Sequence, residues 1–485
     1  MNLWQIPWLE LAIVTPLVGA AWVARRRDPG RAFAWGLAFT AVTFACALLS
    51  WLAFSNGVTP ASVQPLLFGQ RLFAVDELSA PLVALAALLH FLTALATGRT
   101  KMRRFSLSWS LTSETIRLAT FACTAPWVLI GLLTACTIPP WFELRNRGQS
   151  TRVYTLHMGL FVGLLILGWS FIDPEGGHRT QPAWATLPLL AAILIRCGTI
   201  PAHCWLTDWF EHASFGNALL FVTPLTGVYA AIRLVLPIAP DWVLQGIGLF
   251  SLATAVYGAG MALVQDDARR FFAYLFLSHA SLVLVGLELH TSLSLTAALA
   301  LWVSVALSLH GFGLTLRALE ARYGRLQLRS FQGLYSQSPA LAVCFLLTGL
   351  ASVGFPGTLG FVAAELLVDS AVAASPTVGL IVVLASAING IAVVRAYLYL
   401  FTGAQHASTV PLDIGVRERI AVLTLAVLIL GGGLLPQPGV KARHQAAITI
   451  LQMRESRADH PGASQRSRPS LPVVAIPGPP EGNTR

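Results

Sequence analysis

Charged side chains are scarce in this chain. Only 11% of its 485 residues are Asp, Glu, Lys or Arg, whereas 55% are hydrophobic. A soluble domain carries about twice that charged share. The apolar residues come in blocks long enough to cross a hydrocarbon core of about 30 Å as helix, and the alternation that β-barrel strands require is absent. The composition therefore excludes a soluble domain and predicts an all-α, polytopic membrane helical bundle.

Motifs for cofactors, metals and nucleic acids are also missing. None of the six cysteines makes a CxxC pair, so no zinc or cluster site is predicted. No Walker A motif occurs, and no GxGxxG stands between a strand and a helix, so we expect the chain to bind neither ATP nor NADH. The net charge of +10 lies in short runs between apolar blocks, which argues against nucleic-acid binding. We expect no cofactor and no catalytic site within this chain.

Lysine is nearly absent. Lys101 and Lys441 are the only two, and neither lies in an apolar block. A buried lysine can lose its proton, whereas arginine stays charged under protein conditions. A proton relay built on lysine is therefore excluded, and any conduction has to use histidine, glutamate and water.

The apolar blocks predict about fourteen spans. They lie near residues 7–24, 31–54, 78–98, 105–123, 126–142, 153–172, 183–200, 217–238, 241–264, 271–289, 292–316, 338–371, 376–402 and 417–437. The least certain division is within residues 105–142, where the first half is only weakly apolar. Two crossings there place every basic cluster on one side, as the positive-inside rule requires. These clusters are Arg25 to Arg31, Arg99 to Arg104, Arg145 to Arg152, Arg269 with Arg270, and Arg317 to Arg329.

The spans define residues 1–437 as a transmembrane domain of a multi-pass protein of the cell inner, or plasma, membrane. The first apolar run has no basic region before it, so it is predicted to be the first helix and not a cleaved signal. Both termini are expected outside. Residues 438–485 are polar and rich in Pro, Ser and Arg, which predicts a disordered tail.

Helix breakers interrupt several spans. Pro201, Pro224 and residues 354–357 stand inside or beside apolar blocks. A break within the membrane is tolerated where protein or a water-filled cavity satisfies the freed backbone groups, and such breaks are typical of transporters. A simple proline kink is the alternative for any one of them.

Ionisable residues within the spans are the candidates for function, because charge is costly in a bilayer. We interpret Glu114 and Arg117, spaced i,i+3, as a pair that neutralises itself, and His90 as a core histidine. Histidine titrates near neutral pH, and burial raises a glutamate toward that range. The predicted proton or ion path consists of Arg196, His203, Asp208, Glu211, His279, His310 and Glu365.

Five ordered segments carry a resemblance to a known family. They read VDELSAP at 75–81, IPAHCWLTD at 200–208, GVY at 227–229, QDDARRFFAY at 265–274 and GFPGTLGF at 354–361. In this order and spacing the chain resembles the proton-conducting, antiporter-like membrane subunits of respiratory complex I, Mrp antiporters and relatives, including DabB-type subunits. The resemblance implies fourteen helices in two inverted repeats with broken helices, and other membrane subunits as partners.

The chain departs from the family at the positions that carry protons. Thr134 stands where the family has a glutamate on the fifth helix, and Arg196 where it has a lysine on the seventh. Leu314, four residues after His310, replaces another lysine. On the twelfth helix Glu365 comes one residue late, and one residue is about 100° of helix.

Three functions fit these observations. The first, favoured by the family, is translocation of protons or cations within a redox-driven NADH–quinone oxidoreductase-like complex. The second is a DabB-like subunit that couples ion flow to uptake of inorganic carbon, as carbon dioxide or bicarbonate. The third is a scaffold without conduction. The sequence does not choose among the ions or the partner subunits.

Overall fold

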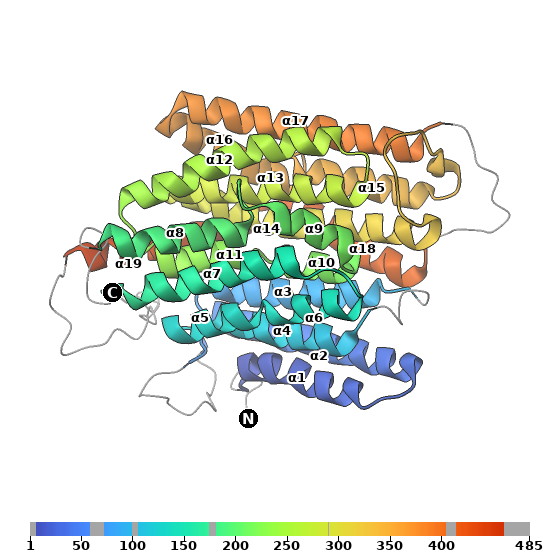
Figure 1. Ribbon diagram of the computed structural model, residues 1–485, viewed down its shortest axis with the longest axis horizontal. Helices are drawn as coiled ribbons and strands as arrows, with labels where there is room; N and C mark the ends of the chain where they lie inside the picture. Colours follow the sequence, from blue (N-terminus) through green and yellow to red (C-terminus); the bar gives the residue numbers. More distant parts are fainter. Residues whose placement is uncertain are drawn as a thin grey trace, which may run out of the picture.

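Helices account for the whole regular structure of the described residues. The computed structural model describes residues 6–58, 72–98, 105–173, 181–289, 291–403 and 414–459. The longer helices lie side by side along one common direction and form a bundle, as predicted (Figure 1).

The helices have the following bounds. They are α1 Trp8–Ala24, α2 Pro29–Ser55, α3 Ser79–Leu95, α4 Leu107–Ala122, α5 Pro126–Ala135, α6 Ile138–Asn146, α7 Arg152–Ser170, α8 Ala183–Cys197, α9 Cys204–His212, α10 Phe215–Val222, α11 Thr226–Ala230, the π-helical η3 Ala231–Val235, α12 Asp241–Val264, α13 Ala268–Glu288, α14 Ser292–Tyr323, the short η4 Leu334–Ser336, α15 Pro339–Ser352, α16 Leu359–Ala374, α17 Pro376–Phe401, α18 Val416–Leu434 and α19 Pro436–Asp459.

Every predicted span contains one helix or a broken pair. Within the described ranges, eight helical runs are long and apolar enough to cross a membrane, and a ninth counts if α18 and α19, bent by 82°, are taken together. Several other predicted spans, α1, α3, α8 and α15 among them, are shorter apolar helices. Residues 105–142 form two helical segments, α4 and then α5 with α6, on either side of a turn. The chain is a multi-pass membrane protein.

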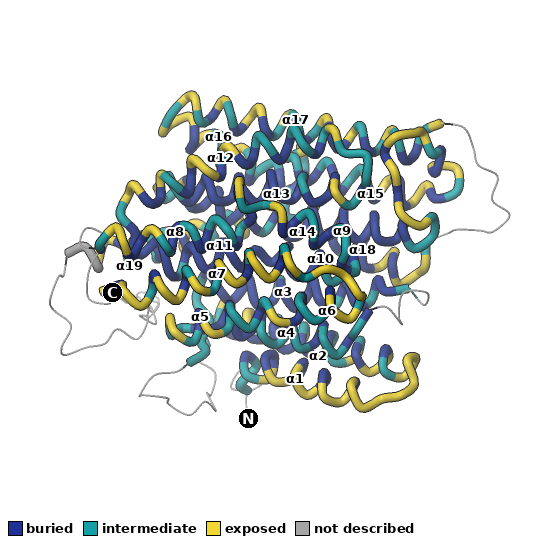
Figure 2. The backbone as a smooth tube through the Cα atoms, viewed as in Figure 1, coloured by how far each residue is buried: buried dark blue, intermediate teal, exposed yellow. Residues whose placement is uncertain are grey.

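The burial pattern fits a membrane bundle with a protein-filled centre. α14 runs through the middle and is buried on nearly all sides, as is α13 (Figure 2). Outer helices instead expose apolar side chains, such as Leu249 on α12, Leu380 on α17 and Val427 on α18. Exposed apolar faces on outer helices suit contact with lipid, while the central helices need polar groups only where function or backbone satisfaction requires them.

The three predicted helix breaks are present. The first separates α8 from α9 around Pro201, and the second separates α10 from α11, where Leu225 has a φ of 52°. The third separates α15 from α16, where Gly354 and Gly357 have φ of 86° and 83°. Positive φ is strained for a leucine and unstrained for glycine, so the second break is held by its surroundings.

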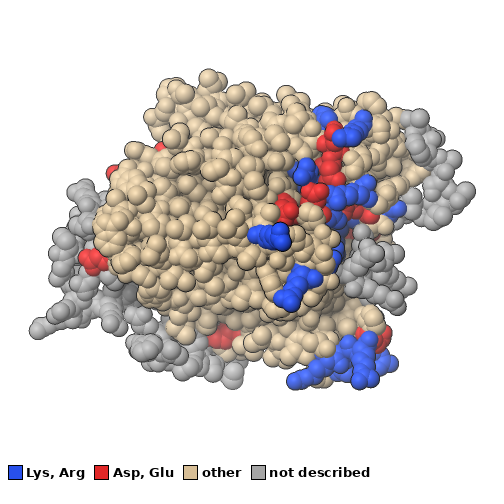
Figure 3. Space-filling model, viewed as in Figure 1, with Lys and Arg blue, Asp and Glu red and all other residues tan. Residues whose placement is uncertain are grey.

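Basic side chains gather at one end of the bundle (Figure 3). Much of this basic end is ion-paired, for example Arg270 with Glu211 at 2.9 Å and Arg325 with Asp267 at 2.8 Å. Arg322 pairs with Glu418 at 2.6 Å. The gathering agrees with the predicted placement of the described clusters on one side. Arg99, Lys101, Arg103 and Arg104 lie outside the described residues.

The C-terminal segment differs from its prediction. Residues 438–459 were expected to be disordered, but they belong to α19, which packs across the other end of the bundle. Its Ala446, Ala447 and Ile450 are buried. Arg454 is also buried and donates through Nη2 to Asp241 at 2.7 Å. The expectation of disorder is wrong for this stretch because a polar helix with a narrow apolar stripe and one buried arginine can still dock. Residues 460–485 lie outside the described part of the chain.

Candidate functional site

The break between α10 and α11 points two threonines at two buried ionisable residues. Thr223, the last residue before Pro224, lies 3.1 Å from Nδ1 of His310 through its Oγ1. Thr226, the first residue of α11, accepts a hydrogen bond from Nη2 of Arg196 at 2.6 Å. The non-helical turn at Pro224 and Leu225 thus lies between the Thr223–His310 contact and the Thr226–Arg196 contact. Breaking this span serves the positioning of side chains, as transporter-like breaks do.

His310 is fully buried and both ring nitrogens have partners. Nε2 lies 2.8 Å from Oγ1 of Thr93 on α3, opposite the contact of Nδ1 with Thr223. A neutral imidazole has one donor and one acceptor nitrogen, and each threonine hydroxyl can donate or accept. The hydroxyl of Thr223 donates to the carbonyl of Leu219 at 2.8 Å, so it accepts from Nδ1 of His310, while Nε2 accepts from Thr93. Rotation of the Thr223 hydroxyl away from Leu219 would reverse the tautomer and so pass a proton across the ring.

Arg196 is buried at the end of α8 without a carboxylate contact among the described residues. Its guanidinium carbon lies 4.5 Å above the ring centroid of Phe221 and 5.8 Å from that of Trp205. Its Nε has no hydrogen-bond partner there. Cation–π contacts offset part of the cost of burying the charge. Arg196 is thus a fixed cation held by aromatic rings and one hydroxyl.

Arg117 pairs with a different partner from the one expected. Its Nη1 donates to Nε2 of His90 at 2.7 Å, because a guanidinium has no acceptor. Both carboxylate oxygens of Glu114 are buried and without a hydrogen-bond partner in the described structure. The charges of Glu114 and Arg117 interact, but the expected pair is not hydrogen-bonded, because the guanidinium donates to His90 instead. His90 is buried in the core, as expected. All three are buried ionisable groups in the centre of the bundle.

Arg317 continues the line of polar groups toward the basic end. It donates through Nη1 to the carbonyl of Thr93 at 3.0 Å and through Nη2 to Oγ1 of Thr97 at 2.8 Å. One turn further along α14, Glu320 makes a two-point contact with Arg269 at 2.7 and 2.8 Å. We call Arg117, His90, Thr93, His310 and Arg317 the polar axis.

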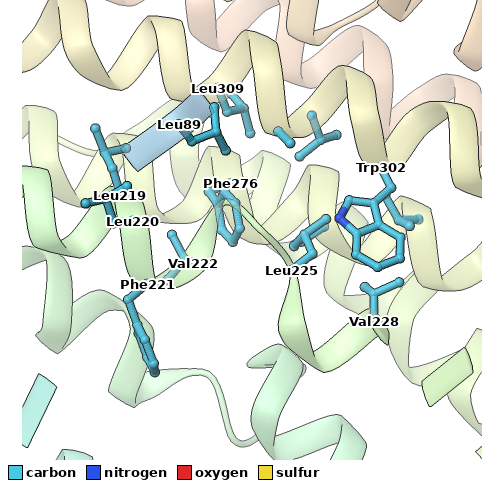
Figure 4. Close-up of a cluster of buried hydrophobic side chains, with 14 of the residues drawn as sticks. Leu89, Leu219, Leu220, Phe221, Val222, Leu225, Val228, Phe276, Trp302 and Leu309 are labelled. Atoms are coloured by element: carbon cyan, nitrogen blue, oxygen red, sulfur yellow. The ribbon is translucent and has the colours of Figure 1, made fainter. Parts of the chain in front are cut away.

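Apolar side chains enclose the polar axis. Leu219, Leu220 and Val222 of α10 face Leu309 of α14 and Leu89 of α3 in one packed cluster (Figure 4). Such surroundings keep the dielectric low and strengthen each electrostatic interaction inside. The axis is consequently a narrow line of polar groups within an apolar core.

Three of the predicted path residues lie near the α8–α9 break and the basic end. Nε2 of His203 lies 3.3 Å from the hydroxyl of Tyr257. Asp208 contacts Nδ1 of His212 at 3.1 Å, and Glu211 pairs with Arg270. These acids occupy partly exposed ion pairs, and among the described residues no hydrogen bond or ion pair joins them directly to the polar axis.

The remaining two predicted residues also lie off the axis. His279 is buried on α13 and its Nδ1 lies 2.8 Å from the carbonyl of Leu275 in its own helix. Glu365 is exposed on the outer face of α16. The sequence placed Glu365 one residue after the family's twelfth-helix position, and this shift of about 100° turns its side chain out of the bundle.

The residues of the polar axis recur in the sequence with helical spacing, and this pattern could have predicted the axis. His90, Thr93 and Thr97 recur at i, i+3 and i+7 within an apolar stretch and therefore share one helix face. His310 and Arg317 are likewise seven residues apart. Such a polar stripe on a buried helix predicts an internal polar line, although it does not name the partners.

The chain is similar in sequence and in fold to membrane subunits of known proteins. A sequence profile described as NADH:quinone oxidoreductase/Mrp antiporter, TM matches residues 164–389. NADH-quinone oxidoreductase subunit 13 of Thermus thermophilus is 28% identical over 87% of this chain and 94% of its own length. NADH-quinone oxidoreductase subunit M of Pseudomonas aeruginosa is 26% identical over 89% and 94%. A chain of respiratory complex I from Thermus thermophilus with bound NADH superposes with a TM-score of 0.82 at 25% identity, covering 92% of this chain and 99% of its own.

The chain is similar over most of its length to antiporter-like membrane subunits of the NADH:quinone oxidoreductase/Mrp type. The family motifs read from the sequence fall at structural joints, since 200–208 spans the α8–α9 break and 354–361 the α15–α16 break. Thr134, at the family's glutamate position, hydrogen-bonds the carbonyl of Ile130 in its own helix at 2.9 Å. In this chain the buried carboxyl near the axis is Glu114 of α4.

Proposed function

We propose that this chain translocates protons as a membrane subunit of a redox-driven, NADH–quinone oxidoreductase-like complex. The single observation that carries the proposal is the polar axis, in which buried histidines alternate with hydroxyls and fixed cations. Similarity to oxidoreductase subunits supports the same assignment. The relatives named above do not include an inorganic-carbon uptake subunit, so nothing supports the DabB-like alternative specifically.

The proposed path uses His310, His90 and Glu114 as the groups that exchange protons. His310 connects hydroxyls from α3 and α10, and Glu114 is a buried carboxyl with free oxygens. Arg117 and Arg196 lie close enough for their charges to interact, and both remain protonated under protein conditions. They therefore act as fixed charges that favour the neutral form of a nearby histidine and the ionised form of a nearby carboxyl.

The test measures proton uptake driven by NADH in inverted membrane vesicles that contain the whole complex. His310→Gln keeps hydrogen-bonding atoms near Thr93 and Thr223 but cannot take up a proton. We expect it to lower the ratio of protons moved to NADH oxidised by about tenfold or more, because a positioned proton carrier contributes about 100-fold or more. His157→Gln is the matched control, since Nδ1 of His157 lies 2.8 Å from the carbonyl of Val153 in its own helix and the residue is not part of the polar axis. An unchanged ratio in the His310 variant, with the complex intact, contradicts the path.

The outer face of α16 supports assembly with another membrane subunit. Glu365 and Asp369 are four residues apart and both are exposed, so they share one face of the helix. A carboxylate facing lipid in the middle of a span is costly. We propose that this acidic pair meets a basic or hydroxyl-rich helix of the neighbouring subunit.

Co-purification of the complex through a tag on this chain tests the contact. We expect the Glu365→Gln, Asp369→Asn double variant to lose a neighbouring subunit at elevated salt, whereas the parent retains it. Glu455→Gln, which removes an exposed carboxylate from α19, is the control. Equal recovery of all subunits from the three proteins rules the acidic pair out as an assembly contact.

A further inference from the structure

A cleft beside Arg117 combines apolar walls with several hydrogen-bond donors. It encloses about 360 Å³ of empty volume, including its mouth, between α4, α6, α9 and α10. Its polar lining groups are Ser110, Ser113, Arg117, Glu143, Trp209 and Asn217. The cleft is distinct from the hydroxyl contacts of His310.

Two of these donors are buried and without a partner among the described residues. They are Nε of Arg117, whose side chain is 2% exposed, and Nε1 of Trp209, whose side chain is 1% exposed. A guanidinium and an indole N–H can only donate. An unpaired buried donor costs about 1–3 kcal/mol. Both N–H groups therefore need a hydrogen-bond acceptor inside the cleft.

The cleft's own acceptors do not meet that requirement. Glu143 is the one carboxylate among the lining residues, and its Oε1 already accepts from Nε of Arg147 at 2.8 Å and from the backbone N–H of Ser214 at 3.1 Å. The charge of Glu143 is thus matched by Arg147. It is not available to neutralise Arg117.

The excess of positive charge around Arg117 favours binding of a negatively charged ligand. Its hydrogen-bond partner, His90, accepts through Nε2 and is therefore neutral, and the charge of Arg196 adds a second cation nearby. Glu114, one turn along α4, interacts electrostatically with Arg117, but its oxygens make no hydrogen bond and it does not line the cleft. Two buried cations beside one carboxyl leave an excess of positive charge, which is strongly disfavoured without a further counter-charge. Water in the cleft would supply an acceptor but no charge.

We propose that this cleft binds a small monovalent inorganic anion, of chloride's size and charge, between Arg117 and Trp209. The hydroxyls of Ser110 and Ser113 and the amide of Asn217 supply further donors. Bound there, the anion holds Arg117 in place and reduces its repulsion with Arg196. The inference does not depend on proton translocation.

Thermal unfolding of the full chain in lipid nanodiscs tests the site, with bromide as the probe. Sodium bromide is titrated against sodium gluconate at constant ionic strength, since a ligand of the folded state raises the Tm in a saturable manner. We expect bromide to raise the Tm of the parent and gluconate to have no effect. In Trp209→Phe and Arg117→Gln the half-saturating bromide concentration should increase about tenfold or more, because each loses a donor to a charged ligand.

Arg145→Gln is the matched control, because Arg145 is exposed on the neighbouring α6. It should keep the parent's bromide response. Anomalous scattering from bromide-soaked crystals should place the ion between Arg117 and Trp209. Equal effects of bromide and gluconate on the parent, as a cleft filled only by water would give, overturn the proposal. So does a bromide response that is the same in all variants, or a bromide peak located elsewhere.

Discussion

Nη1 of Arg117 donates a hydrogen bond to Nε2 of His90 at 2.7 Å and so joins α4 to α3 inside the bundle. The contact fixes His90 as a neutral acceptor through Nε2, with its proton on Nδ1. It also leaves Glu114, one turn away from Arg117, without a hydrogen bond to that guanidinium, although their charges interact. This pair therefore sets the charge states at one end of the polar axis, where Arg117 is charged and His90 is neutral.

Removing the acceptor of that pair should destabilise the protein. We expect His90→Phe to lower the free energy of unfolding by about 2 kcal/mol, because a buried charged donor loses its partner. His90→Gln, which retains an acceptor oxygen, should recover most of the loss. His157→Phe serves as the control on α7. Chemical denaturation in mild detergent measures all four proteins, and equal stabilities for the Phe and Gln variants of His90 would argue against the hydrogen bond.

Gly227 permits α11 to approach α8 closely. A Cβ at this position would lie 2.7 Å from Sγ of Cys197 and 3.2 Å from Cγ of Arg196. Gly227→Ala should therefore cost about 1–3 kcal/mol by overpacking and displace Arg196 from Thr226. Gly260→Ala on α12, where nothing lies within 4 Å of the added atom, should be neutral or stabilising. Adding Cys197→Ala to Gly227→Ala should restore stability if the clash is the cause.

Asp76, in the loop before α3, makes stability depend on pH. Burial of the carboxyl would raise its pKa, but Arg233 at 2.7 Å and hydrogen bonds from Ser79 outweigh that effect and lower the pKa below its ordinary value. The stabilisation is thus present above the ordinary aspartate pKa of about 3.9 and is lost as the pH falls through the lowered value. Asp76→Asn should flatten the acid limb of a stability-versus-pH curve. Parent and variant curves of the same shape would contradict the pairing.

Arg454 anchors α19 to the bundle. Its Nη1 donates to the carbonyls of Leu236 and Ala239, and its Nη2 donates to Asp241. Arg454→Gln should loosen α19 by about 2 kcal/mol, since several charged hydrogen bonds are lost. Hydrogen exchange of the α19 amides should become faster in this variant and remain unchanged in Lys441→Gln, which alters an exposed cation of the same helix. Unchanged exchange in the Arg454 variant would show that the apolar stripe alone holds the helix.

The orientation of the bundle is checked by reporter fusions. The basic end, which includes Arg147, should face the cytoplasm, and the α7–α8 connection beyond Asp173 should face outside. A fusion after Arg147 should give an inside signal and a fusion after Asp173 an outside signal. The reverse result at either position would contradict the predicted topology.

The sequence by itself determined where the helices lie and where they break. Hydropathy is a local property of the chain, so blocks of apolar residues locate the spans without knowledge of their neighbours. Pro201, Pro224 and the glycines around Pro356 marked the breaks for the same reason, because their backbone constraints act within one or two residues. The scarcity of lysine also settled, without any structure, that a lysine relay is impossible.

Only the tertiary structure decided which ionisable groups meet. Arg117 is closer in sequence to Glu114 than to His90, yet the contact is with His90, because helix packing and not sequence spacing sets the distance between α3 and α4. Glu365 lies in an apolar span and looked like a path residue, but a rotation of about 100° per residue turns it outward. α19 is polar overall and docks through three apolar side chains and Arg454. Contacts between helices depend on rotation and packing, which no local pattern of residues records.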